Sequence, residues 1–273
     1  DARLGVALLM HDSGDALGAR ARLDELVGLA PDNGRVLIEA ARIDAITGAL
    51  AKAQERLAQA EAQPSVPRWV LARERGRVAL KNLQAAVAIS ELERAVSLQP
   101  ADGDARLLLI DAHLAGEDGN SARKRLDAIL RDASLGPEVQ QLALGRVELH
   151  FGRDAAALAA FGKARAQLEQ RKAPPRAVAE VVSWIGRAHY DAGQIDKARE
   201  VLREAVALDP SQADAWFYLG YAENERGGGA AALAAFQKAA RLDEANADAW
   251  FFFGEAAVAQ RQRKLARQAL ERY

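Results

Sequence analysis

The stretches Ala198-x-x-x-Leu202-x-x-Ala205 and Ala232-x-x-x-Phe236-x-x-Ala239 contain the same pattern of small and large residues, 34 positions apart. This spacing sets a register that recurs in both directions through nearly the whole chain. A fixed period of about 20–50 residues is typical of proteins that stack one supersecondary unit many times. The sequence therefore predicts a repeat array rather than a domain with one core.

Each unit in this register pairs small residues with a large one. The first half of a unit carries a small residue in every case but Ile110, namely Ala7, Ala41, Gly76, Gly145, Gly186, Gly220 and Gly254. The second half carries a small residue at Ala19, Ala53, Ala88, Ala122, Ala157, Ala198, Ala232 and Ala266, and a large one at Leu23, Leu57, Leu92, Leu126, Phe161, Leu202, Phe236 and Leu270. A small residue opposite a large one lets two helices approach to about 8–10 Å. Each unit is therefore expected to be a helical hairpin.

Turn and cap signals agree with this register. We expect the first helix of a unit to end at a glycine, where a left-handed backbone costs least. These glycines are Gly14, Gly48, Gly152, Gly193 and Gly227. The second helix is expected to end at Pro31, Pro64, Pro100 or Pro210, since proline does not continue a helix interior. Polar residues such as Asp32, Asn33, Asp102, Ser211 and Asp248 lie where the next helix needs a cap.

The pattern resembles the tetratricopeptide repeat, whose unit reads W-x-x-L-G, then a small residue, an aromatic or Leu, Ala and finally Pro. Trp216-x-x-Leu219-Gly220 followed by Ala232, Phe236 and Ala239 fits this unit. The third and fourth units depart from it at Arg75 and Ile110. The resemblance implies an all-α fold, a right-handed α-solenoid superhelix of about eight tetratricopeptide hairpins.

The whole chain is interpreted as one array of 273 residues. Its units lie near 1–33, 34–68, 69–102, 103–137, 138–178, 179–212, 213–246 and 247–273. Because the chain starts and stops inside a repeat, we expect it to be a fragment of a longer protein. The fifth unit holds seven extra residues around Gln170–Pro175, interpreted as a longer second helix with a Pro-Pro stop. A flexible joint between a five-unit and a three-unit segment is the alternative.

The amino-acid composition limits the classes of function that the chain can have. Lys and Arg number 37 and Asp and Glu number 38, so the net charge is −1, whereas a general phosphate-backbone binder is strongly basic. We therefore expect no nucleic-acid partner. No apolar run approaches the roughly 18 residues of a membrane span. The chain has no cysteine, so it gives no redox signal and leaves a cytoplasmic or a periplasmic location open.

The resemblance places the binding groove on the first helices of the units. Inward positions hold Arg42, Arg73, Arg77, Arg146 and Arg187, a row of fork-shaped donors suited to carboxylates. The alternative is a set of solvated helix faces whose aliphatic stems cover neighbouring Ala and Leu.

Inward positions of the last three units are aromatic instead. They hold Trp184, Tyr190, Phe217, Tyr218, Tyr221 and Phe252. Packing between helices explains Phe217 and Tyr190, but not Trp184, Tyr218, Tyr221 or Phe252. Arg and aromatic residues are common interface anchors. The expected groove is thus cationic at one end and aromatic at the other.

Signals for chemistry are weak. The histidines His11, His113, His150 and His189 fall in different units without metal-ligand spacing. Gly227-Gly228-Gly229 follows no strand and precedes no Lys-Ser/Thr pair, so it does not match a phosphate-binding loop. Tyr221 and Asn224 invite comparison with relatives that clamp a C-terminal carboxylate, but the clamp's Lys and paired Asn are absent. We expect no enzyme activity, cofactor or metal.

Two functions follow from these features. The preferred one is a protein–protein interaction scaffold or adaptor that binds a peptide or small domain, with acidic and apolar anchor residues, in its concave groove. The alternative is a structural component of a bacterial secretion, pilus, motility or polysaccharide-export machine that uses the convex face or unit ends. The bias toward Ala, Arg and Leu favours a bacterial source. Partner identity, pathway and oligomeric state do not follow from the sequence.

Overall fold

The computed structural model describes residues 2–273, which form sixteen α-helices. Their bounds are α1 Ala2–Asp12, α2 Ala16–Leu29, α3 Gly34–Ile46, α4 Leu50–Glu61, α5 Arg68–Lys81, α6 Ala85–Leu98, α7 Gly103–Ala115, α8 Gly119–Arg131, α9 Pro137–His150, α10 Asp154–Gln170, α11 Pro175–Asp191, α12 Ile195–Leu208, α13 Ala213–Glu225, α14 Gly229–Leu242, α15 Ala247–Ala259 and α16 Arg263–Leu270. Each helix packs against the next one along the chain. Within residues 2–273, every helix is too short or too polar to span a bilayer.

The small-against-large contact of each pair is visible in the packing. A Cβ at Gly145 would lie 2.5 Å from Cδ1 of Phe161, and one at Gly220 would lie 2.6 Å from Cδ1 of Phe236. Gly186 is covered in the same way by Leu202. The absence of a side chain on the first helix therefore lets the large residue of the second helix fill the space.

Helix ends follow the local signals in part. The five turn glycines all have positive φ, between 68° at Gly152 and 86° at Gly14. Asn33 and Asp102 accept a hydrogen bond from the backbone two or three residues into the next helix, as N-caps do. Asp32, Ser211 and Asp248 do not occupy the N-cap position, which falls on Asn33, Gln212 and Asn246 instead.

The extra residues of the fifth unit lengthen two helices. Helices α10 and α11 have 17 residues each, and Pro174 and Pro175 lie at the junction between them. The two helices pack on one another, so the chain continues through this junction without a gap in the stack.

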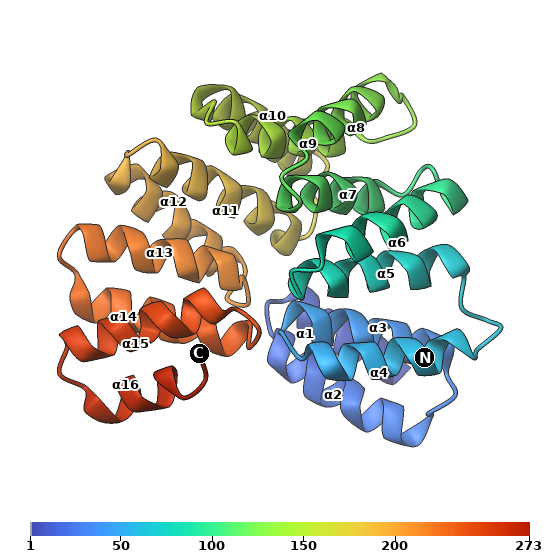
Figure 1. The fold of residues 1–273 in the computed structure, drawn as a ribbon, viewed down its shortest axis with the longest axis horizontal. Coiled ribbons are helices and arrows are strands. Elements are labelled where there is room, and N and C mark those ends of the chain that lie inside the picture. Colours follow the sequence, from blue (N-terminus) through green and yellow to red (C-terminus); the bar gives the residue numbers. More distant parts are fainter. Residues whose placement is uncertain (1) are drawn as a thin grey trace.

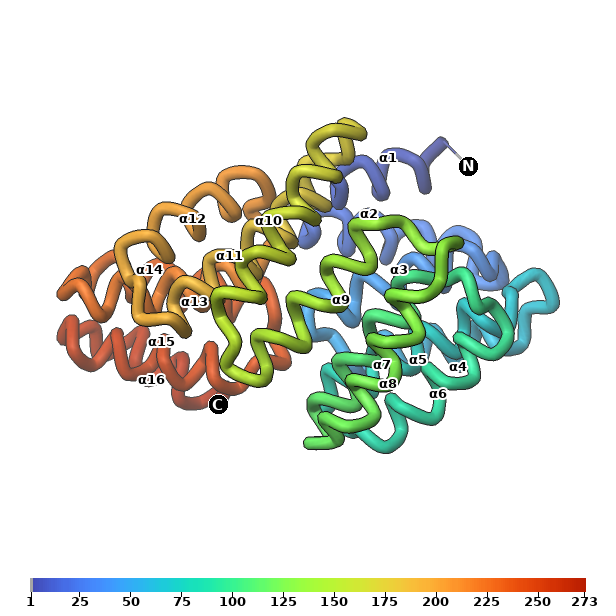
Figure 2. Tube along the Cα trace, turned by 90° about the horizontal axis from the view of Figure 1, so that it is seen from above, coloured from blue at the N-terminus to red at the C-terminus, as the bar shows by residue number. Residues whose placement is uncertain are grey.

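The stack bends into an arc whose ends come back together (Figure 1). We call α1–α6 the N-terminal arm and α11–α16 the C-terminal arm; they lie on opposite sides in the view from above (Figure 2). Buried residues form successive clusters along this path instead of one centre, for example one from Leu4 to Ile43 and another from Ala232 to Ala269.

Loops of the C-terminal arm touch the N-terminal arm. Lys81 at the end of α5 lies 2.5 Å from a carboxylate oxygen of Asp243, which follows α14. The backbone N–H of Glu244 donates to the carbonyl of Thr47 at 3.0 Å, and the Glu244 side chain lies 2.9 Å from Arg20. Gly48 faces the same loop with φ +79, where a Cβ would collide with the backbone of Glu244. The arc is therefore closed by contacts between distant residues.

We expect Gly145→Ala to destabilise the chain by about 1–3 kcal/mol, because the added methyl group meets the buried ring of Phe161. Gly162→Ala on the adjoining helix is the matched control. Gly162 is exposed with nothing near its Cβ position, so alanine there should stabilise by up to about 1 kcal/mol through helix propensity. Urea unfolding of both variants measures the difference. Equal effects at the two sites would contradict the packing assignment.

We expect Lys81→Glu to open the arc, because it places a second carboxylate beside the buried Asp243. The chain has no cysteine, so spin labels at Ser97→Cys and Ala259→Cys report the distance between the arms by pulsed electron resonance. The distribution should broaden and lengthen with Lys81→Glu and stay close to the parent with Lys81→Arg. An unchanged distribution in Lys81→Glu would show that this ion pair does not hold the arms together.

Candidate functional site

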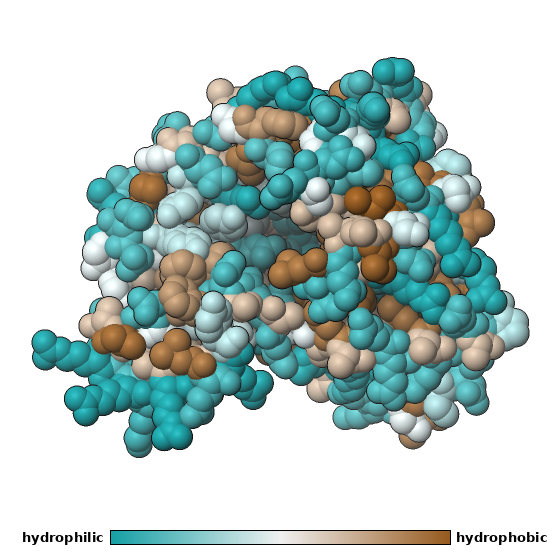
Figure 3. Space-filling view, in the orientation of Figure 1, coloured by the Kyte–Doolittle hydropathy of each residue, from teal (hydrophilic) through white to brown (hydrophobic). Residues whose placement is uncertain are grey.

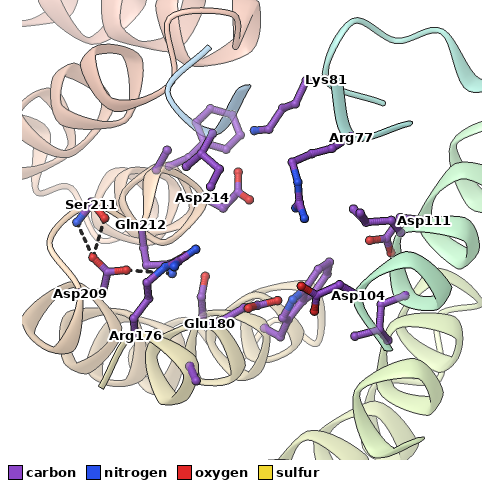
Figure 4. A pocket seen from close by; sticks show the side chains of 18 of the residues that line it. Arg77, Lys81, Asp104, Asp111, Arg176, Glu180, Asp209, Ser211, Gln212 and Asp214 are labelled. Atoms are coloured by element: carbon purple, nitrogen blue, oxygen red, sulfur yellow. Dashed lines mark hydrogen bonds between the residues drawn. The ribbon is translucent and has the colours of Figure 1, made fainter. Parts of the chain in front are cut away.

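A cavity of about 620 Å³ lies between the two arms. Figure 3 shows it as a hollow near the centre of the face presented in Figure 1. The walls come from the first helices of several pairs, with the loop between α12 and α13 on one side. Side chains from both arms point into it (Figure 4).

Seven of the predicted groove residues line this cavity, namely Arg42, Arg77, Arg146, Trp184, Arg187, Phe217 and Tyr218. The other five lie outside its lining: Arg73, Tyr190, Tyr221, Asn224 and Phe252. The repeat register thus indicated the face of the first helices that lines this cavity, but not which positions reach it, and the partner-binding role of these residues stays a prediction.

The charge of the cavity differs from the cationic groove expected from the sequence. Its cationic side chains are Arg42, Arg77, Lys81, Arg146, Arg176 and Arg187, and its carboxylates are Asp12, Asp104, Asp111, Glu180, Asp209 and Asp214. The two sets have equal numbers, so the lining is mixed and close to neutral. The prediction of a cationic groove considered only the row of arginines, and the acidic residues on neighbouring turns and loops balance that row.

Arg146 is the most constrained cation of the site. Its side chain is 7% exposed and donates to Asp111 at 2.6 Å and to Glu180 at 2.7 Å. Burial lowers the pKa of Arg146, but Asp111 and Glu180 outweigh this and leave it above its ordinary value. The guanidinium therefore bridges α7 and α11, and its charge is already balanced without a partner.

The cations of α5 are held by carboxylates as well. Arg77 and Arg73 both donate to Glu74, which is 1% exposed, and Arg73 also reaches Asp102 at 3.1 Å. Burial raises the pKa of Glu74, but Arg77 and Arg73 outweigh it and hold the carboxyl ionised. Arg73 consequently stabilises the stack from outside the cavity, whereas Arg77 faces the cavity near Lys81 (Figure 4).

Trp184 forms the centre of an aromatic shelf on α11. The guanidinium of Arg187 lies 5.3 Å from the Trp184 ring centre and 5.1 Å from that of Tyr218, in the range of cation–π contacts. Arg146 approaches the same Trp184 ring at 5.1 Å. Burial raises the pKa of Tyr218 to about 12, so this phenol is neutral at physiological pH.

Tyr190, Tyr221 and Phe252 pack with one another outside the cavity. Tyr221 lies 5.6 Å from Tyr190 and 4.8 Å from Phe252 between ring centres, and Phe217 joins this cluster at 4.8 Å from Tyr221. Burial raises the pKa of Tyr221 to about 12. Asn224 is exposed at the end of α13. The cluster extends the aromatic surface of the C-terminal arm beyond the cavity.

The inter-helix segments supply residues that the register did not indicate. Asp209 is 1% exposed, and its carboxylate accepts hydrogen bonds from Ser211 and Gln212. Figure 4 shows Arg176 beside this group. Arg176 belongs to the long α10–α11 insertion, which has no counterpart in the other units. The sequence signal that could have indicated Arg176 is its position directly after Pro174-Pro175, in the first turn of a helix.

Polar groups and aromatic rings, rather than reactive groups, define this arrangement. Within residues 2–273, His, Asp and Glu side chains form no group of three or more that would hold a metal ion. The cavity offers fork-shaped donors, carboxylate acceptors and an aromatic shelf, which together suit recognition of a polar ligand with an apolar part.

Two parts of the chain match models of known repeat families. A tetratricopeptide repeat model matches residues 79–144, and a TPR repeat model matches residues 186–224. The first of these covers units that depart from the repeat pattern at Ile110, so the register holds there too. The chain contains tetratricopeptide repeats.

Solved structures share the fold of this chain. A chain in the crystal structure of the APC/C hetero-tetramer Cut9-Hcn1 has a TM-score of 0.62 and 15% identity over 99% of the present chain. The present chain spans about half (52%) of that chain's length. A tetratricopeptide repeat protein from Parabacteroides merdae ATCC 43184 has a TM-score of 0.58 and 13% identity, over 93% of this chain and 97% of its own. No curated protein matches the sequence.

Tetratricopeptide repeats are in general protein-interaction modules without catalytic activity. The matched repeats therefore support a general role of this chain in protein–protein interaction.

We expect His11 to make the stability of this protein depend on pH. His11 lines the cavity and is 1% exposed, and burial together with Arg176 and Arg42 lowers its pKa from 6.5 to about 3. Between these values the unfolded chain binds a proton that the folded chain does not, so stability is full above pH 6.5 and is lost as the pH falls. The loss from this group is about 1.4 kcal/mol per pH unit.

The comparison is between the parent and His11→Gln, with the unfolding free energy measured from pH 7 to about pH 5. Asp44, whose pKa burial raises to about 6, contributes with the opposite sign but is common to both proteins. The difference between the two curves therefore isolates His11. Parallel curves would contradict a neutral, buried His11.

Proposed function

We propose that this scaffold binds a short polypeptide segment in the central cavity. The observation that supports this is a cavity of about 620 Å³ lined both by paired charges and by the aromatic shelf. That size is typical of pockets for small ligands. It suits a few residues of an extended segment or chain end better than a folded domain.

The Trp184 shelf is proposed to anchor the segment. Trp184 is half-buried against the core, and Phe217 and Tyr218 from α13 line the cavity beside it. Aromatic side chains contribute large contact areas at small cost in conformational entropy, which makes them frequent hot spots. An apolar side chain of the partner would cover these rings.

Arg187 is the cation best placed to contact a segment on this shelf. Its side chain is 39% exposed, and its carboxylate neighbour Asp191 lies 3.6 Å away, beyond ordinary hydrogen-bond distance. In the part of the chain that the structure describes, its buried Nε has no hydrogen-bond partner. Arg187 therefore retains donors for an acceptor of the partner.

In this proposed function the chain is one array of eight units whose first helices jointly form the wall of the cavity. Successive buried clusters run from α1 to α16, and each helix contacts the next. The site depends on this continuity, because its two walls belong to units far apart in sequence.

We expect peptides selected against the whole protein to require the shelf. A peptide library displayed with free carboxyl termini is selected on the parent, and affinities are then measured for Trp184→Ala and Arg187→Glu. Each change should weaken binding about tenfold or more, about 1.4 kcal/mol, as for central anchors of an interface.

Matched changes on exposed surfaces control for general effects. Phe151→Ala removes an exposed aromatic ring in the α9–α10 turn, and Arg131→Glu reverses a charge that is 81% exposed on α8. Both should leave affinity unchanged. Loss of binding with these two variants and not with the shelf variants would favour the convex face, and with it a structural assembly role, over the cavity.

A further inference from the structure

Arg42 and Arg176 line the same cavity from opposite arms. Arg42 belongs to α3 and Arg176 to the first turn of α11, and both line the cavity. Burial, and after it the charge of Arg42, lowers the pKa of Arg176 below its ordinary value. Two like charges in a partly buried space repel each other. The closed arc therefore holds together a pair of cations that an anion would stabilise.

Neighbouring carboxylates accept hydrogen bonds from only some of the N–H groups of Arg42 and Arg176. Arg42 donates one edge of its guanidinium to Glu39 on its own helix, at 2.8–2.9 Å. The carboxylate nearest to Arg176 is Asp12, and the two are 3.6 Å apart, which is too long for a hydrogen bond. A cation in the first turn of a helix is also disfavoured by the helix dipole.

The other neighbouring acids are engaged elsewhere. Both carboxylate oxygens of Asp209 accept hydrogen bonds, one from Ser211 and the other from Gln212. Glu180 accepts from Arg146 at 2.7 Å. The side chain of Arg176 is 29% exposed and lines the cavity, so it is open to a ligand.

His11 lines the same cavity as this pair, and in the described part of the chain its ring nitrogens are further polar groups that lack partners. Among residues 2–273, neither of its buried ring nitrogens has a hydrogen-bond partner. A buried polar group without a partner is rare and costly. Both arginines act on the imidazole through space, so the titration of His11 reports on any charge placed between them.

We infer that Arg42 and Arg176 bind a single carboxylate group of the polypeptide segment that occupies the cavity. This inference rests on the proposed function and adds the chemistry of one contact. A guanidinium binds a carboxylate with two parallel hydrogen bonds. A monoanion suits the site because Glu39 shares Arg42 and Asp12 lies beside Arg176, so little positive charge is left for a dianion. The bound group bridges the N-terminal arm and α11.

The direct test uses sodium acetate as a probe of the full chain. Acetate replaces chloride at constant ionic strength, and the imidazole signals of His11, assigned by their loss in His11→Gln, are followed by NMR. A carboxylate between the arginines offsets their effect on the imidazole, so the signals should shift saturably and the pKa of His11 should rise. Inorganic phosphate should act more weakly than acetate.

Two arginine variants and a control separate this site from a general salt effect. Arg176→Gln removes no hydrogen bond to a neighbouring side chain, and Arg42→Gln provides a second variant should the first alter folding. Both should abolish the saturable shift. Arg263→Gln changes an exposed arginine in the first turn of α16 and should leave it intact. No response to acetate in the parent, or an equal response in all variants, overturns the inference.

The second test uses the selected peptides and distinguishes two sources of the carboxylate. C-terminal amidation removes the chain-end carboxylate, and Asp→Asn or Glu→Gln changes remove those of side chains. One of these peptide changes should weaken binding to the parent protein about tenfold. The same change should weaken binding to the Arg176→Gln protein much less, as expected for two groups that interact directly.

The two tests also keep this inference apart from the proposed function. If peptides bind through Trp184 and Arg187 but no carboxylate couples to Arg176, the subsite is wrong and cavity binding stands. If no peptide is selected while acetate still shifts His11 through Arg42 and Arg176, peptide binding fails and the carboxylate site stands.

Discussion

The contact between a small residue on the first helix and a large residue on the second is the interaction on which the structure depends. The ring of Phe161 packs against Gly145, and the ring of Phe236 packs against Gly220, each so closely that no room is left for a Cβ atom. Because this contact recurs with the same spacing, the hairpins stack in sequence, and small rotations between them add up along the stack. The result is an arc whose curvature brings helices far apart in sequence to the two sides of one cavity (Figures 1 and 3).

Closure of the arc changes the character of the concave face. An open solenoid presents its inner helices to solvent, but here loops of the C-terminal arm reach the N-terminal arm and contribute Asp209, Asp243 and Glu244. Asp209 lines the cavity and Asp243 pairs with the cavity cation Lys81, whereas Glu244 pairs with Arg20 on α2. With the acids of the first helices, they leave the cavity charges largely balanced before any ligand is bound. A partner must therefore match the few positions where balance is incomplete, near Arg176 and Arg187. This requirement favours specificity over nonspecific electrostatic attraction.

The site was predictable from the sequence to the extent that it follows the repeat register. Arg42, Arg77, Arg146 and Arg187 share one phase, and all four reach the cavity. Arg73 lies one turn away on the same helix, but Glu74 and Asp102 hold it in the stack. Periodicity identifies a face of a helix; it does not say which neighbour a long side chain will pair with. For the same reason Tyr190, Tyr221 and Phe252 pack with each other instead of lining the cavity.

The sequence by itself determined the all-helical class, the hairpin unit, the glycine turns and the face that points inward, because all of these follow from local spacing, backbone preferences and a contact within about 20 residues. Only the tertiary structure decided that the arc closes, that the cavity is of mixed charge and that Arg42 and Arg176 line the same cavity. These features depend on pairs such as Lys81 and Asp243, which are 162 positions apart. Their proximity arises from the sum of many small rotations between hairpins, and no local pattern encodes that sum.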